Sequence, residues 1–554
     1  MGKPICLSAV ILLFSLAALA QTSTFRQKTI SCDDPSGIFC TEAYDYVGYN
    51  GAYTGHDEPS VLFYSNASGA GNTMVYLMQL PKDPPTLPKQ DGTGGTFNFQ
   101  LHPAFWVGMA MCDDQSAPNP GGSYIGPNIP CSPNSDVNIF DGSDPTKADY
   151  IGKHPGAGFM EMQFYPPGWV NGADPTRWAS ALNIDSLSEN MNTGLGNNAA
   201  CGGAVEYVNF AFITKDGVPT GPPGPLLQNN STFTPNADTL FYNPGDVLRI
   251  SLQDTGHGLK ITIDDLTSGE SGFMVASAGN GFAEILYDPT GHNCNPKTHN
   301  LLTDFHPMYA SSSEHTRVPW AAHTYNIAFS DEIGHFEYCS TVSAEGGSCT
   351  SGSSDAAGLD ENFCFDAAYA SEFGLIPIGG CLDSDVEFDG VPYQLVWPGT
   401  STSASQDLRL HARPVVFTSP RFTASDGSLQ NYSRVAFEAN LPRIEFATSP
   451  PCQRHISNPA DTNPGAGCVD PPTGANFYPI FSTTGGSSKC SWQLGGASIP
   501  GTTNTFGGTS TAEYGGLLAS GYPAANGQPS FRYNNFRNVL NSNPCASTGT
   551  LAAQ

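Results

Sequence analysis

Polar and large apolar residues alternate along one short stretch, and the polar ones could carry acid–base chemistry. The stretch from Gly158 to Trp169 reads GFMEMQFYPPGW. This alternation predicts a strand with Glu161, Gln163 and Tyr165 on one face and methionine and phenylalanine on the core side. A carboxylate, an amide and an aromatic ring on one sheet face can hold a sugar chain and transfer a proton to it. Glu161 and Gln163 are therefore candidate catalytic residues, and the alternative is a solvated sheet face without a function.

Further aromatic and polar residues could bind the same substrate. The stretch FNFQLH repeats the alternation and puts Gln100 and His102 on one face. Aromatic rings are the usual stacking surfaces for extended ligands. The candidate stacking rings are Tyr165, Trp169 and Trp106, and Gln100 and His102 are candidate polar contacts.

Histidines are concentrated in the middle of the chain. Seven of the twelve histidines lie between residues 257 and 335. His335 and Glu337 would share one strand face and could form either a metal site or an acid–base pair, which makes Glu337 the candidate partner of Glu161. We expect at least three of the four candidate transition-metal ligands to converge in one pocket of the large domain: His306, His315, His323 and His335. No HExxH motif is present, so scattered surface histidines are the alternative.

A second candidate cation site is acidic. The stretch DSDVEFDG begins at Asp383 and offers the oxygen ligands that calcium prefers, with Asp383, Asp385 and Asp389 as candidate ligands. The glycine of an EF-hand loop is missing, so only a calcium site of another kind is open. The alternative is a charged edge strand that discourages sheet pairing.

The elements that would position these residues are mostly strands. The 61 glycines and 45 prolines leave few places for long helices, and short β-branched and aromatic runs recur between them. One helix is expected from Pro175, with Asp174 as its N-cap, and a short one over 535–540. A hairpin is expected at Asp254-Thr255-Gly256. Representative expected strands are 74–78, 97–101, 159–165, 204–213, 247–252, 259–263, 325–329, 336–339, 415–418 and 434–439.

One strand pair resembles a known architecture. The run GDVLRI from Gly245, followed by LKITIDDLTSG from Leu259, resembles strand pairs of concanavalin-like sandwiches, including those of the glutamic peptidases. The resemblance implies a fold and no function by itself. A glutamic peptidase would use a glutamate and a glutamine together, and Glu161 and Gln163 supply these types. We therefore expect an all-β fold: a large concanavalin- or jelly-roll-like sandwich followed by a cysteine-rich, mostly β C-terminal region.

The beginning of the chain has the features of a cleavable secretory signal. Lys3 precedes an apolar run, and Ala18-Leu19-Ala20 is a good peptidase site. The run is too short for a membrane span, so we expect a secreted protein, extracellular or periplasmic, cleaved near Ala20. The expected parts are the signal at 1–20, a sandwich at 21–345 that carries the active or binding groove, and a disulfide-rich region at 346–554, separated by a glycine- and serine-rich stretch.

Cysteine usage agrees with export. One of the fifteen cysteines lies in the signal, and the remaining even number suits full pairing in an oxidising compartment. The sequence does not determine the connectivity. The default is pairing of neighbours: Cys32 with Cys40, Cys112 with Cys131, Cys339 with Cys349, Cys364 with Cys381 and Cys452 with Cys468, which leaves Cys201 for Cys294 and Cys490 for Cys545.

Charge and missing motifs exclude several functions. With 22 basic and 50 acidic residues the formal net charge is −28, which repels phosphate backbones, so nucleic acid is not an expected partner. No GxSxG elbow, P-loop or dinucleotide motif is present. The leading hypothesis is a secreted hydrolase of an extracellular polymer, with a polysaccharide as the favoured substrate. The alternatives are a non-enzymatic carbohydrate-binding or surface-adhesion protein, and a glutamic-type peptidase or metal-dependent enzyme.

Overall fold

The structure is a computed structural model, and it describes the strands of the fold together with some of their connections. The described residues are 60–65, 67–80, 82, 105–113, 131–133, 146, 156–165, 176–187, 189–190, 195–196, 206–286, 295–307, 320–324, 341–342, 349–351, 415–440, 444–445, 455–456, 468–469, 481–484, 490–494, 518–523, 529–540, 543 and 545.

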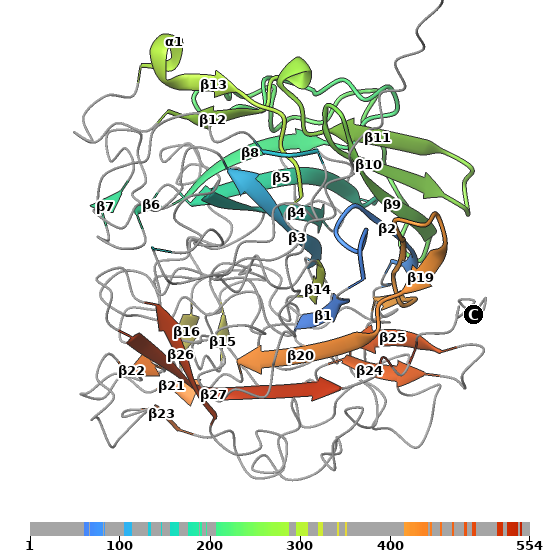
Figure 1. Cartoon of the computed structure of the whole chain (residues 1–554), viewed down its shortest axis with the longest axis vertical. Helices are drawn as coiled ribbons and strands as arrows, with labels where there is room; N and C mark the ends of the chain where they lie inside the picture. Colours follow the sequence, from blue (N-terminus) through green and yellow to red (C-terminus); the bar gives the residue numbers. More distant parts are fainter. Residues whose placement is uncertain are drawn as a thin grey trace, which may run out of the picture.

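Two large antiparallel sheets make up the described fold (Figure 1). The first sheet runs in the order β22-β27-β20-β1-β14-β3-β4-β5-β8, with β26 paired to β27. Its strands are β22 (His455–Ile456), β27 (Pro529–Leu540), β20 (Arg434–Asn440), β1 (Ser60–Tyr64), β14 (Trp320–Thr324), β3 (Phe105–Asp113), β4 (Gly156–Tyr165), β5 (Ala179–Leu187), β8 (Glu206–Phe212) and β26 (Leu518–Pro523).

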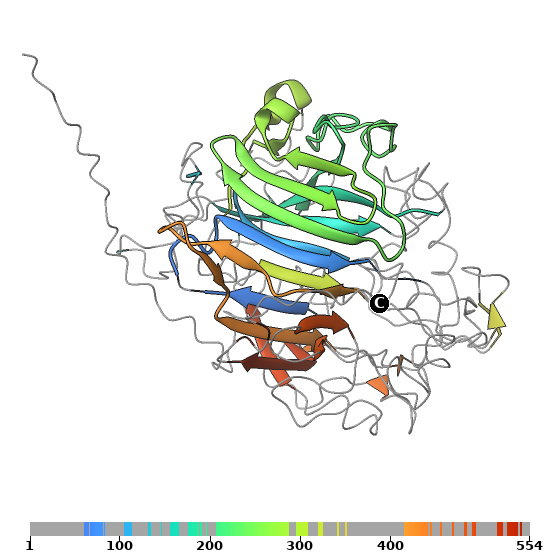
Figure 2. The same ribbon diagram turned by 90° about the vertical axis from the view of Figure 1, so that its right-hand side faces the viewer.

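The second sheet runs in the order β11-β10-β9-β2-β17-β25-β24, with β18 and β19 attached beside β2. Its strands are β11 (Ser271–Val275), β10 (Gly258–Asp265), β9 (Val247–Thr255), β2 (Thr73–Gln79), β17 (Val416–Phe417), β25 (Ser491–Leu494), β24 (Phe481–Thr484), β18 (Arg421–Thr423) and β19 (Leu429–Asn431). In Figure 2, blue, green and orange strands lie side by side, so segments far apart in the sequence share the sheets.

An apolar core shared by both sheets lies between them. Met160 and Met162 of β4 in the first sheet and Ile250 and Ile261 of the second are fully buried in the same cluster. The alternation in the sequence explains this arrangement, since every second residue of a strand points to the same side. The expected all-β sandwich with antiparallel sheets is therefore confirmed.

All of the expected strands that fall on described residues are present. The expected strands at 74–78, 159–165, 204–213, 247–252, 259–263, 415–418 and 434–439 correspond to β2, β4, β8, β9, β10, β17 and β20. The expected strands at 97–101, 325–329 and 336–339 lie outside the described residues, as do the signal and the expected boundary at 345.

The expected hairpin joins β9 to β10. Thr255 is directly opposite Gly258, and Gly258 has a φ of +97° that an L side chain rarely adopts. The Thr255 hydroxyl donates to the Gly258 carbonyl oxygen at 2.6 Å, which closes the turn.

Both expected helices are wrong. After a turn at Thr176, Trp178 forms a bridge with Tyr242 and β5 begins at Ala179. Residues 535–540 belong to β27, where they pair with β20. In both places the pairing with a neighbouring strand outweighs the local helix signal.

The remaining elements are short. Helix α1 (Pro296–His299) has Asn295 as its N-cap, whose side chain accepts from the Lys297 N–H at 3.0 Å. A 3₁₀ turn covers Ala278–Asn280. The paired short strands are β6 (Glu189–Asn190) with β7 (Leu195–Gly196), β12 (Ala283–Ile285) with β13 (Asn300–Leu302), β15 (Thr341–Val342) with β16 (Cys349–Ser351), and β21 (Ile444–Glu445) with β23 (Cys468–Val469).

Two of the expected disulfides fall on described residues, and both are formed. Cys112 pairs with Cys131, and Cys490 pairs with Cys545. Cys545, near the C-terminus, is thereby linked to the start of β25.

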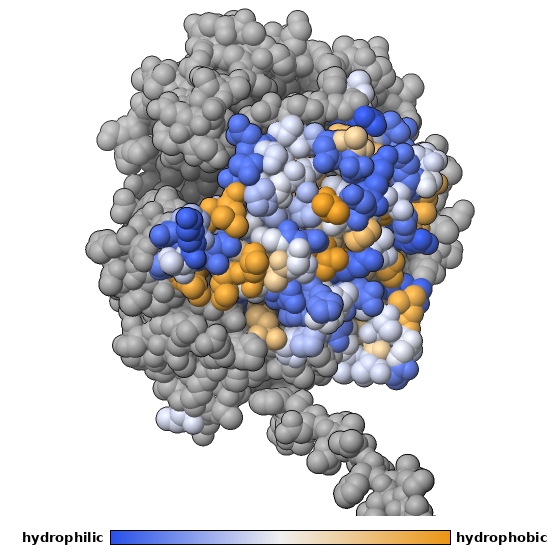
Figure 3. All heavy atoms as spheres, turned by 90° about the horizontal axis from the view of Figure 1, so that it is seen from above, coloured by the Kyte–Doolittle hydropathy of each residue, from blue (hydrophilic) through white to orange (hydrophobic). Residues whose placement is uncertain are grey.

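The surface seen from above in Figure 3 is mostly hydrophilic where it is described, with separate small hydrophobic spots. A search of the described residues for a helix long and apolar enough to cross a membrane found none.

Candidate functional site

Strand β4 carries the candidate site on the face that points away from the core between the sheets. Met160, Met162 and Phe164 have no exposed surface and belong to this core. Glu161 and Gln163 alternate with them and therefore lie on the opposite face. The face assignment made from the sequence is confirmed.

A chain of hydrogen bonds connects the polar side chains of this face. The Gln163 amide Nε2 donates to Glu161 Oε2, and the Tyr165 hydroxyl donates to Gln163 Oε1. Asn183 Nδ2 of β5 donates to the Tyr165 hydroxyl at 3.2 Å. Each hydrogen bond of this network is donated in the direction of the Glu161 carboxylate.

Asn183 enters the network because of the sheet register. It lies directly opposite Glu161 in the pairing of β4 with β5. Its side chain is buried, and its Oδ1 has no hydrogen-bond partner among the described residues. This residue was missed at the sequence level, since its relation to Glu161 depends on which strand lies next to β4.

Aromatic side chains border the network on the side of β8. The Tyr165 ring is 6.4 Å from the Phe210 ring, which in turn is 5.1 Å from Phe233 of the β8–β9 connection. Arg177 lies over the Phe241 ring at 4.5 Å. Tyr165 is only 3% exposed, so its ring is covered and its polar contacts are made by the hydroxyl. Phe233 and Phe241 are only partly buried.

The Glu161 carboxyl group is largely buried and has a hydrogen-bond donor. The residue is 9% exposed, and its Oε2 accepts from a neutral amide N–H. Such a hydrogen bond supports the charged form, whereas burial opposes it. The group can therefore take up or release a proton in a site largely shielded from water.

The register also places two other predicted residues near this network. Trp106 of β3 is directly opposite Gln163, and His323 of β14 is directly opposite Trp106. Directly paired residues of antiparallel strands lie on the same face of the sheet. Three segments that are distant in the sequence therefore contribute to one row across the sheet.

A second carboxylate residue lies diagonal to Glu161. Asp185 of β5 is opposite Phe159, two positions before Glu161 on β4. Diagonal neighbours of this kind are separated by about 7 to 8 Å in an antiparallel pair. The sequence signal for this residue is the alternation in the stretch ASALNIDSL, which follows the position where a helix is expected to begin, Pro175.

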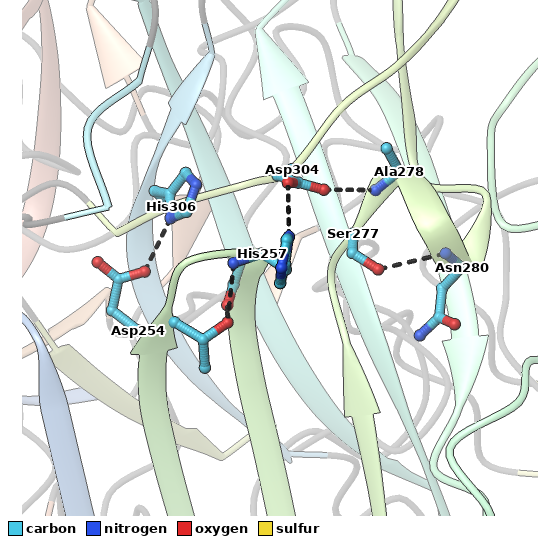
Figure 4. A network of polar contacts seen from close by, with 9 residues as sticks. Asp254, His257, Ser277, Ala278, Asn280, Asp304 and His306 are labelled. Atoms are coloured by element: carbon cyan, nitrogen blue, oxygen red, sulfur yellow. Dashed lines mark hydrogen bonds and ion pairs between the residues drawn. The ribbon is translucent and has the colours of Figure 1, made fainter.

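His306 has a different environment from the network on β4 (Figure 4). His306 Nδ1 lies 2.8 Å from Asp254 Oδ1, and both side chains are buried. Burial raises the pKa of Asp254, and the hydrogen bond and charge of His306 partly offset this rise. Beside this pair, His257 Nδ1 is 3.9 Å from Asp304 Oδ2 and is 89% exposed.

No group of three histidine, cysteine, aspartate or glutamate side chains suited to a metal ion occurs among the described residues. The other predicted site residues lie outside the part of the chain that the structure describes: Glu337, Trp169, His102, Gln100, His315, His335, Asp383, Asp385 and Asp389. Of His323 and Trp106 the structure describes the register alone.

Comparison of the chain with models of known protein families and with curated protein sequences gave no match.

Proposed function

We propose that the protein is a secreted hydrolase of an extracellular polymer, of the polysaccharide class, and that Glu161 is its proton-transferring carboxylate. The observation that carries the proposal is the hydrogen-bond chain from Asn183 through Tyr165 and Gln163 to Glu161. A solvated sheet face would not require such a chain, because water would satisfy each polar group separately. An oriented, partly desolvated carboxylate is what general acid–base catalysis uses.

A glycosidase needs a second carboxyl group. The two carboxyl groups of such enzymes are about 5 to 9.5 Å apart. Asp185 has a register position compatible with this range, and Glu337, predicted from the sequence, is the other candidate. We take Asp185 as the first residue to test.

The predicted secretory signal, the two disulfides and the acidic composition support an extracellular substrate. A neutral sugar chain would meet no electrostatic repulsion from a protein with a formal charge of −28.

The test begins with a screen of the purified protein against a panel of polysaccharides and proteins, with and without a chelator that would remove calcium or a transition metal. On the substrate found, Glu161→Gln should lower turnover by roughly 10² to 10⁴, because it keeps the shape of the side chain and removes proton transfer. Asp185→Asn should lower turnover by a similar factor.

Glu270→Gln is the matched control, since Glu270 is exposed and pairs with Lys215 on the surface. This variant should keep wild-type turnover. If Glu161→Gln folds normally and keeps wild-type turnover, Glu161 is not catalytic and the proposal fails. Binding of a polysaccharide without any turnover would identify a carbohydrate-binding protein instead.

Peptide hydrolysis is the second candidate function. The specific observation in its favour is the direct hydrogen bond between Gln163 and Glu161, the two residue types that a glutamic-type peptidase uses. Hydrolysis of a protein from the panel, abolished in both Glu161→Gln and Gln163→Ala, would favour this candidate over the first.

A further inference from the structure

We infer that Gln163, Tyr165 and Asn183 are positioning residues that orient the Glu161 carboxyl group and stabilise its ionised form relative to its neutral form. The catalytic meaning of this inference rests on the proposed function. The underlying statement about the ionisation of Glu161 can be tested without it.

The direction of each hydrogen bond follows from the donors and acceptors available. A glutamine amide has an acceptor oxygen and a donor nitrogen. The Gln163 oxygen accepts from the Tyr165 hydroxyl, so its nitrogen remains to donate to Glu161. The hydroxyl of Tyr165 has one proton, and Tyr165 in turn accepts from Asn183. Each contact therefore fixes the direction of the next.

The arrangement supports a neutral Glu161 less well than an ionised one. A carboxylate oxygen accepts from an amide N–H more strongly than the carbonyl oxygen of a neutral carboxyl group does. A proton on Oε2 itself would face the amide nitrogen of Gln163, which has no acceptor capacity. Protonation at this oxygen would require the Gln163 amide to turn over. The Tyr165 hydroxyl would then have to donate elsewhere, so the change would pass along the whole chain.

The far end of the chain is anchored by burial. Asn183 is 3% exposed, and the Tyr165 ring that it contacts is packed against Phe210. Neither side chain can rotate freely, and the direction of the hydrogen bonds is therefore held from the end opposite Glu161. A carboxylate stabilised in this way is suited to act as a base or nucleophile, and Asp185 has the nearest described register position for a second carboxyl group.

The test compares Tyr165→Phe and Asn183→Leu with the wild-type protein in the complete chain. Tyr165→Phe keeps the packed ring and removes the hydroxyl that orients Gln163. The protonation of Glu161 is followed by NMR of ¹³C-labelled glutamate carboxyl groups, with Glu161→Gln to assign the signal. In both variants the titration of Glu161 should move to higher pH by on the order of one pH unit, because the ionised form loses support.

On the acidic side of the pH–activity profile, where Glu161 becomes protonated, the midpoint should move to higher pH by the same amount. At pH values below this midpoint the variants should be about tenfold less active than the wild type, with a smaller difference at neutral pH. Tyr242→Phe is the matched control, since it removes a buried tyrosine hydroxyl that contacts Ser180 and not Glu161. It should leave both profiles unchanged.

The outcomes separate the inference from the proposed function. An unchanged Glu161 titration in folded Tyr165→Phe and Asn183→Leu overturns the inference, and the function stands if Glu161→Gln is still inactive. A shifted titration with no activity on any polymer overturns the function and leaves the positioning role intact. If Tyr165→Phe does not fold, Asn183→Leu alone decides.

Discussion

His306 Nδ1 lies 2.8 Å from Asp254 Oδ1, and this contact connects the end of β9 to the segment that follows β13. The Asp254 side chain is 2% exposed, and its Oδ2 has no hydrogen-bond partner in the part of the chain that the structure describes. The same segment reaches β3, since the Cys112 N–H donates to the His306 carbonyl oxygen at 2.8 Å. The pair therefore lies where a strand of each sheet meets one connecting segment.

Removal of the His306 side chain should destabilise the protein. We expect His306→Ala to lower the free energy of unfolding by about 3 to 5 kcal/mol at pH 7, since Asp254 would remain buried without its partner. The loss should become smaller as the pH falls, because a neutral Asp254 is easier to bury. Urea unfolding at several pH values measures both effects. His257→Ala, at an exposed site, should change stability by no more than about 0.5 kcal/mol. Equal losses in the two variants would contradict this role for His306.

Asp246 should make the protein more stable in mild acid. Burial raises the pKa of Asp246, and the negative charge of Asp265 raises it further. A carboxyl group with a raised folded pKa contributes stability below its unfolded pKa, and this contribution is lost as the pH rises through the folded pKa. Between pH 7 and pH 4 the wild type should therefore gain stability relative to Asp246→Asn. Paired denaturation curves over this range provide the measurement, and a constant difference between the two proteins would count against the prediction.

Two glycines with similar backbone angles should respond differently to alanine. Gly258 and Gly269 have φ values of +97° and +81°. A Cβ on Gly258 would lie 2.2 Å from the Ala276 carbonyl oxygen, whereas Gly269 has open space. Gly269→Ala should cost about 1 to 2 kcal/mol from backbone strain alone, and Gly258→Ala about 1 to 3 kcal/mol more. Thermal unfolding of the two variants measures the difference. Equal midpoints would contradict the prediction and show that the turn at Gly258 can shift to accommodate the added Cβ.

Trp492 should stabilise strands from both ends of the chain. It is fully buried, its ring packs edge-on against Phe63 at 5.7 Å, and its Nε1 donates to Ser419 Oγ at 3.0 Å. Trp492→Ala should lower the free energy of unfolding by about 3 to 5 kcal/mol and lower the midpoint of a single unfolding transition. Leu429→Ala, at an exposed position of β19, is the control and should change stability little. Two separate transitions, with one unchanged, would contradict the shared core.

Local patterns predicted the faces of the strands well. The alternation in β4 correctly separated Met160 and Met162 from Glu161 and Gln163, since the two-residue period of a strand is written in the sequence. The hairpin between β9 and β10 was also visible, because its turn residues have distinct backbone preferences. Both expected cysteine pairings that the structure can test are correct, the neighbour pairing of Cys112 with Cys131 and the remaining pair of Cys490 with Cys545.

Relations between strands could not be predicted in this way. Asn183 lies opposite Glu161 because β5 pairs with β4, and no local pattern specifies that pairing. The same pairing overrode the helix signal expected from Pro175. The local sequence predicts Asp254 as a turn residue. It does not predict the contact with His306, because His306 lies on another segment. Register and neighbour choice are tertiary properties, so the candidate site could be predicted along one strand and not across the sheet.

The position of β1 has a consequence for how the chain can fold. β1 lies between β14 and β20, where Ser60 pairs with His323 on one side and with Glu438 on the other. Contacts between such distant segments form slowly, because a long loop has to close before they can form. During synthesis β1 has no partner until most of the chain has emerged, and its unpaired edges are open to association with other chains. Productive folding should therefore depend on synthesis of most of the polypeptide before the first sheet can close, and on protection of this early strand until then.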